Sequence, residues 1–212
     1  MKKPKIKDII QFEPQEILSP SQRDKSQAFL VNSLRKAVFD WRNKNYPKVT
    51  KTTRRLLEFW FEEDHLIEDE KEDKKFQFWF AQREAIETLI YIYEVLGKRK
   101  FVDLASDFGE GPFKYDPKVD KYPLYAFKMA SGSGKTFVMA SCIVWSYFNY
   151  KRENKDNYTS KFLVISPNVI VYERLKRDFA EGKIFNEKPF IPPEWKEGFR
   201  LKVILRKDSL RA

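Results

Sequence analysis

Cysteine and histidine are nearly absent from this chain of 212 residues, which holds one of each, Cys142 and His65. A lone cysteine excludes an internal disulfide framework and fits a reducing cytoplasm. A lone histidine argues against a metal centre or catalytic triad built on histidine. The longest apolar run, 137–148, is interrupted by serines and is shorter than the roughly 18 residues of a membrane span. No apolar stretch follows the basic residues 1–5, so we expect neither a signal peptide nor a membrane partner.

Acidic residues are outnumbered, because 41 lysines and arginines face 31 aspartates and glutamates, giving a net charge of +10. Residues 121–212 hold 18 basic and 9 acidic residues, and residues 1–50 hold 11 basic and 5 acidic residues. Residues 51–120 are acidic by comparison, with 12 basic and 17 acidic residues. A basic half of this kind indicates a polyanionic partner, with nucleic acid the first candidate. A basic surface that serves only solubility is the alternative. Hydrophobic residues make up 42% of the chain, which is enough to bury a core.

Glycine is scarce as well, and two of the seven glycines fall in one short run, Ala130-Ser-Gly-Ser-Gly-Lys-Thr136. Gly132 and Gly134 allow a tight bend that brings backbone N–H groups close to phosphate oxygens. Lys135 supplies a mobile positive charge for the β- and γ-phosphates, and Thr136 supplies a hydroxyl where Mg²⁺ would bind. The helix expected to follow directs its positive end at the same anion. The run therefore predicts a site for a nucleoside triphosphate.

The residues on either side of this run support that interpretation. Residues 124–129 read as a short strand and residues 136–150 as an apolar helix, which is the strand, turn and helix order that a phosphate-binding loop requires. A flexible glycine–serine linker is the alternative, but a linker would not lie between two apolar elements. The usual pattern has one more glycine, at the position where this chain has Met129.

Residues 1–75 are predicted to form a helical N-terminal extension. Ser19–Gln22 has the pattern of a capped helix start, and apolar residues at helical spacing up to Trp41 predict a helix of about 20 residues. A second helix follows, with Thr50 or Thr53 as its cap. The charged run 62–75 is interpreted as a solvated helix face or a hinge before the next unit.

Residues 76–212 are predicted to form an α/β unit, in which strands and helices alternate and a parallel sheet is covered by helices on both faces. Gly97 is expected to end the first helix in a left-handed conformation. The expected elements are a helix over 76–96, a long loop over 101–123, strands over 124–129, 162–166 and 201–205, and helices over 136–150 and from Asn168 to Phe179.

Four stretches together resemble the first motor lobe of superfamily-2 helicases of the DEAD/DEAH type, and most of all the Res subunits of type III restriction enzymes. The likeness covers roughly 76–207 and is specific in the combination of its parts. The stretches are Phe78-Trp-Phe-Ala-Gln-Arg-Glu-Ala-Ile86, Tyr125-Ala-Phe-Lys-Met-Ala-Ser-Gly-Ser-Gly-Lys-Thr-Phe-Val-Met139, Phe162-Leu-Val-Ile-Ser-Pro-Asn-Val-Ile-Val171 and Phe190-Ile-Pro-Pro-Glu-Trp195.

The resemblance implies a partial RecA-like lobe that uses ATP and Mg²⁺, and it implies a role for each matching residue. Lys135 would be the catalytic lysine, Thr136 would hold Mg²⁺, and Gln82 would read the adenine, whereas an ordinary helix glutamine is the alternative for that position. The ATP-binding residues would be Gln82, Ala130, Ser131, Gly132, Ser133, Gly134, Lys135 and Thr136. Residues expected to contact a DNA backbone are Pro167, Asn168 and Arg174, and a solvated helix face is the alternative for Arg174.

The Asp-Glu motif of these helicases does not occur after 201–205, and no second motor lobe or nuclease is present in the 212 residues. We therefore expect an N-terminal fragment of an ATP-dependent DNA helicase or translocase from a type III restriction–modification system. Its expected partners are DNA, with RNA second, and a methyltransferase subunit. A non-catalytic fragment that binds nucleic acid or a partner through a vestigial loop is the alternative. A nucleotide kinase would give no reason for the glutamine stretch.

Overall fold

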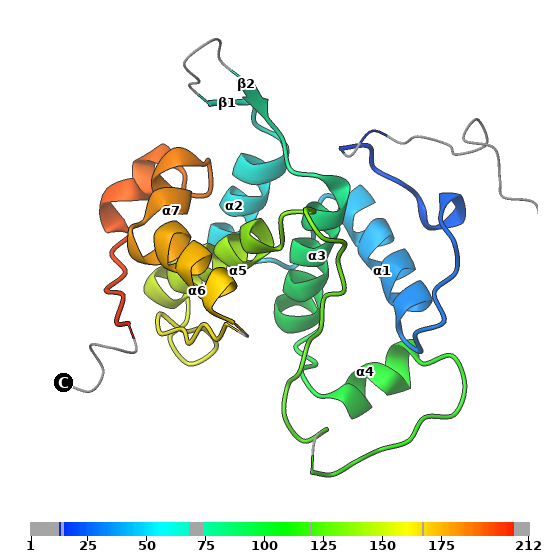
Figure 1. The fold of residues 1–212 in the computed structure, drawn as a ribbon. Coiled ribbons are helices and arrows are strands. Elements are labelled where there is room, and N and C mark those ends of the chain that lie inside the picture. The colour runs from blue at the N-terminus through cyan, green and yellow to red at the C-terminus, as the bar shows by residue number, and fades with distance from the viewer. Residues whose placement is uncertain (1–12, 14, 68–73, 119, 167, 206–212) are drawn as a thin grey trace, which may run out of the picture.

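Helices make up nearly all of the regular secondary structure among the described residues (Figure 1). The structure is a computed structural model that describes residues 13, 15–67, 74–118, 120–166 and 168–205. The α-helices are α1 (Val31–Asn43), α2 (Lys51–Phe61), α3 (Phe80–Ile90), α4 (Phe101–Phe108), α5 (Lys135–Arg152), α6 (Val169–Leu175) and α7 (Lys183–Glu187). Shorter helical turns are η2 (Pro20–Gln22), η3 (Tyr91–Val95), η4 (Lys176–Ala180) and η5 (Pro193–Gly198), and two strands are β1 (His65–Ile67) and β2 (Lys74–Phe76).

Helix α5 forms the centre of the fold and packs against both α2 and α3. The sequence predicts a helix over 136–150, and the structure confirms it with one additional residue at the start and two at the end. Its buried side chains point in several directions around the helix, and they include Val138, Val144 and Phe148. Within the described part of the chain, none of the helices combines the length and the hydropathy needed to cross a bilayer.

One hydrophobic core runs from α1 to η5 and includes residues on both sides of the predicted boundary at 75/76. Val38 of α1, Leu56 of α2, Ile86 of α3 and Trp195 of η5 belong to the same buried cluster. The helices of the N-terminal extension therefore share their apolar faces with α3 and α5. The division of the chain into two domains stays a prediction.

Side chains cap the starts of η2 and α2. Ser19 and Gln22 form the predicted capping box, with the Ser19 N–H donating to Gln22 Oε1 at 2.8 Å, but the turn ends at Arg23. The prediction of one helix of about 20 residues is therefore wrong in its start, because backbone at Arg23 is extended and α1 begins only at Val31. Thr50 Oγ1 caps α2 by accepting from the Thr53 N–H at 3.0 Å, so Thr50 and not Thr53 is the N-cap.

Helix α3 starts at Phe80, four residues after the predicted start at Phe76. Trp79 is its N-cap with extended backbone, and the Trp79 N–H donates to Gln82 Oε1 at 3.0 Å. The extended backbone at Trp79 ends the helix on that side, and Phe76 instead belongs to β2. Gly97 follows η3 with a φ of 63°, the left-handed conformation that its position predicts.

The charged run 62–75 contains a β-hairpin in place of a helix face. β1 and β2 pair antiparallel, with His65 opposite Phe76 and Ile67 opposite Lys74. The hairpin projects from the body of the fold in Figure 1. Residues 68–73 lie outside the described residues.

The predicted loop 101–123 begins with α4, so that part of the prediction is wrong. Phe101 packs on Phe113 with ring centroids 5.4 Å apart, and Phe29 lies 5.5 Å from Phe113. These aromatic contacts come from segments far apart in the sequence, which is why local composition did not indicate a helix here.

The segments 124–129, 162–166 and 201–205 carry no strand assignment, and β1 and β2 are the only strands among the described residues. A strand is stabilised by backbone hydrogen bonds to a neighbour, and within the described part of the chain no bond between two backbone groups involves these three segments. Many of their apolar side chains are exposed, with Leu163 at 86% and Ile165 at 80%. The parallel sheet of a RecA-like lobe stays a prediction.

Candidate nucleotide-binding site

The glycine-rich run 130–136 forms a tight turn that leads directly into α5. Gly132 and Gly134 have φ angles of 80° and 76°, which non-glycine residues rarely adopt. Gly134 is the N-cap of α5. In the described structure, the backbone N–H groups of Gly134, Lys135 and Thr136 donate no hydrogen bond to another backbone group. These donors, at the positive end of an 18-residue helix, form a cradle suited to an anion.

Two side chains of the loop donate to its own carbonyl oxygens. Ser133 Oγ donates to the Ala130 carbonyl at 2.7 Å. Lys135 Nζ donates to the carbonyls of Ala130 at 2.8 Å and Met129 at 3.0 Å. Because Lys135 is exposed, its ammonium can leave these carbonyls for a stronger acceptor such as a phosphate oxygen.

Gln82 joins α3 to the loop. Its Nε2 donates to the Ser133 carbonyl at 2.9 Å while its Oε1 accepts the Trp79 N–H, and the residue is only 4% exposed. A Cβ added at Gly134 would come within 2.3 Å of Gln82 Nε2, so the side chain lies directly against the loop. The structure thus brings Gln82 together with the loop, as the resemblance implies. Its role in reading adenine stays a prediction, because both ends of the amide are bonded within the protein.

Thr136 is half-buried in the first turn of α5, close behind the lysine. Its hydroxyl is a hard oxygen ligand of the kind Mg²⁺ prefers, so the residue fits the predicted metal role. The described residues contain no group of three or more histidine, cysteine or acidic side chains that could hold a metal ion. An ion that bridges one hydroxyl and the phosphates of a nucleotide needs no such group.

The residues predicted to contact DNA lie at the start of α6. Pro167 lies outside the described residues. Asn168 caps α6 as predicted, with Oδ1 accepting from the Val171 N–H at 2.9 Å. Arg174 is exposed, and its Nε lies 3.8 Å from Asp178 Oδ2, one turn further along. No hydrogen bond or ion pair in the described residues joins these side chains to the loop.

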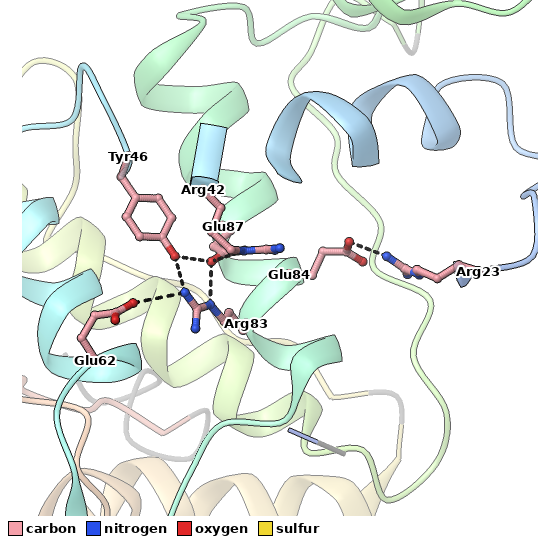
Figure 2. Close-up of polar contacts among 7 residues, drawn as sticks. All are labelled: Arg23, Arg42, Tyr46, Glu62, Arg83, Glu84 and Glu87. Carbon is pink, nitrogen blue, oxygen red and sulfur yellow. Dashed lines mark hydrogen bonds and ion pairs between the residues drawn. The ribbon is translucent and has the colours of Figure 1, made fainter. Parts of the chain in front are cut away.

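A buried polar cluster behind α3 was not predicted from the sequence. We define the Glu87 cluster as Arg42, Tyr46, Arg83 and Glu87, with Glu62 at its edge (Figure 2). The Glu87 side chain is fully buried and accepts from three partners: Arg42 through Nε and Nη2, Arg83 Nε at 2.8 Å and Tyr46 OH at 2.6 Å. The one local signal is the i, i+4 spacing of Arg83 and Glu87.

The cluster raises the pKa values of two of its members, Tyr46 and Arg83. Burial, and then the negative charge of Glu87, raise the pKa of Tyr46, so this phenol stays protonated. Burial acts to lower the pKa of Arg83, but its interactions with Tyr46 and Glu87, including a hydrogen bond to each, outweigh burial and the pKa is raised. Arg42 Nη1 is buried without a hydrogen-bond partner in the described structure. Its guanidinium lies 5.5 Å from the centroid of Phe80, which partly compensates.

Residues 75–202 match the protein family described as type III restriction enzyme, res subunit. The match spans more than half of the chain, so the chain belongs to this helicase-related ATPase family. It covers the glycine-rich loop, Gln82 and the start of α6, but not α1 or α2. Searches of curated proteins and of solved structures gave no match.

Proposed function

We propose that this chain is the ATP-binding part of a DNA translocase of type III restriction systems. The conformation of the loop carries the proposal: two glycines with positive φ and free N–H groups lie at the start of a long helix. A triphosphate carries several negative charges and needs this concentration of donors. The family membership supports the same reading.

In this proposal each residue of the site has a separate task. The N–H groups of Gly134, Lys135 and Thr136 bind phosphate oxygens, and Lys135 Nζ moves from its two carbonyls to the β- and γ-phosphates. The Thr136 hydroxyl holds Mg²⁺, which neutralises phosphate charge when bound. Gln82 reads adenine by exchanging its bond to the Ser133 carbonyl for one to the base.

We further propose that residues 124–129, 162–166 and 201–205 pair as parallel strands of a RecA-like lobe, with 1–75 as its helical extension. The exposed Leu163 and Ile165 support this, because apolar side chains of a buried strand are exposed when the strand has no neighbours. Asn168 and Arg174 would then contact a DNA backbone. A methyltransferase subunit is the protein partner that the family suggests.

The substitution Lys135→Ala tests the nucleotide site. Removing one charge-assisted contact to phosphate, worth about 1.5–3 kcal/mol, weakens ATP binding by about 10- to 100-fold. Lys128→Ala is the matched control, because Lys128 is also an exposed lysine near the loop and removes the same charge. Both are measured by calorimetric titration of the chain with Mg·ATP. Equal affinities of the two variants would overturn the proposal.

A further inference from the structure

The N-terminal segment contacts one side of α3, and Gln82 projects from the other side. The residues that it contacts recur at three- and four-residue spacing and share a side of the helix: Phe80, Arg83, Glu84 and Glu87. At 100° per residue, Gln82 points about 150° away from the mean direction of these four residues around the helix axis. Its side chain reaches the Ser133 carbonyl. Any rotation or shift of α3 therefore moves Gln82 relative to the loop.

Three residues that precede α2 make contacts with these positions, and Glu62 adds an ion pair to Arg83 from the end of α2 (Figure 2). Arg23 Nη1 lies 2.5 Å from Glu84 Oε1, and its guanidinium lies 5.2 Å from the Phe80 ring centroid. Arg42 donates to both oxygens of Glu87.

Tyr46 links two residues of α3 at once: its OH donates to Glu87 Oε1 and accepts from Arg83 Nη2, both at 2.6 Å. Charge-assisted bonds to a planar guanidinium are directional, so this arrangement fixes both the axial position and the rotation of α3. The Glu87 cluster is also buried, so water does not compete for the same bonds.

We infer that Arg42 and Tyr46 are positioning residues of the loop site, which act through α3 and Gln82 on the glycine-rich run. This deepens the proposed function and rests on it for the identity of the ligand. Neither residue contacts the loop, and both precede the part of the chain that matches the family. The N-terminal extension is thereby assigned a share in shaping the nucleotide site.

Hydrogen exchange of the whole chain without nucleotide tests the inference. The amides to follow are those of Ser133, Phe137 and Val138, which donate to carbonyls of the loop. Tyr46→Phe removes only the hydroxyl, and we expect these amides to exchange about three- to tenfold faster. Arg42→Met should have the larger effect in the same direction.

The control and the double variant separate positioning from general loss of stability. Arg55→Met is the control, because it also removes an arginine that is paired with carboxylate oxygens, but its partners are Glu63 and Glu194 and not a residue of α3. It should leave the three loop amides unchanged. In a Gln82→Ala background, Tyr46→Phe should add less than about a twofold change, since the connection to the loop is already gone.

Two results would overturn the inference: unchanged loop amides in Tyr46→Phe, or an equal effect of Tyr46→Phe with and without Gln82. If Arg42→Met does not fold, Tyr46→Phe decides alone. Titration with Mg·ATP is a separate arm, in which Tyr46→Phe should weaken binding by about twofold or more. Absence of ATP binding to the unaltered chain would refute the proposed function, while the exchange rates would still decide whether Tyr46 acts on the loop.

Discussion

Replacing Gly134 by alanine perturbs the loop at the point where Gln82 touches it, and Gly132 offers a matched comparison. Both glycines have a φ near 80°, so each Gly→Ala change forces a left-handed alanine, at about 1–2 kcal/mol. A Cβ at position 132 would meet nothing within 4 Å, whereas a Cβ at position 134 would lie 2.3 Å from Gln82 Nε2. The second change must also displace the Gln82 amide.

The additional loss of stability caused by alanine at position 134 can be worked out from the contacts of the Gln82 amide. Gln82 is buried, so displacing it breaks the 2.9 Å bond to the Ser133 carbonyl and leaves buried polar atoms unpaired. An unsatisfied buried polar group costs about 1–3 kcal/mol. We therefore expect Gly134→Ala to lower the free energy of unfolding by about 1–3 kcal/mol more than Gly132→Ala does.

Urea unfolding followed by the fluorescence of the five tryptophans measures this difference. In a Gln82→Ala background the penalty of Gly134→Ala should fall to that of Gly132→Ala, because the obstructing side chain is gone. Equal losses for the two single glycine variants in the unaltered chain would refute the reasoning, since they would show that Gln82 does not lie against the loop.

Further predictions concern two side chains outside the loop, Thr50 and Cys142. Thr50→Ala should lower the free energy of unfolding by about 1–2 kcal/mol in the same urea assay, because Thr50 Oγ1 caps α2 and also donates to Asn149 Oδ1 at 2.7 Å. Thr50→Ser keeps the hydroxyl and should recover most of the lost stability. Burial raises the pKa of Cys142 to about 12, so the folded chain should react with a thiol reagent at pH 8 far more slowly than the urea-unfolded chain, and equal rates would contradict the structure. Since the folded thiol holds its proton more tightly than an unfolded one, its contribution to stability is complete below about pH 8.5 and is lost as pH rises above that value.

The boundaries of several elements could be predicted because their signals are local. The Ser19–Gln22 box, the Thr50 cap, the left-handed Gly97 and the Asn168 cap each involve residues within about one turn of each other. Helix α5 was predicted almost to the residue, since it follows the glycine-rich run and is apolar on most sides.

The errors in the fold arise where distant contacts decide the conformation. Helix α4 is covered by Phe29, more than seventy residues earlier in the chain, and no local pattern could indicate that contact. The helix predicted from Ser19 stops at Arg23, whose side chain pairs with Glu84 of α3. Local propensity is a weak preference, and tertiary contacts override it.

The composition of the glycine-rich run was sufficient to specify its bend and its free donors, because glycine adopts the positive φ of both positions without the steric cost that a side chain adds. The resemblance also placed Gln82 beside the glycine-rich run. The side chain's partner, the Ser133 carbonyl, and the burial of Glu87 between two arginines could be read only from the folded chain. Each depends on how α1, α3 and α5 pack against one another, and such packing joins residues that no sequence spacing brings together.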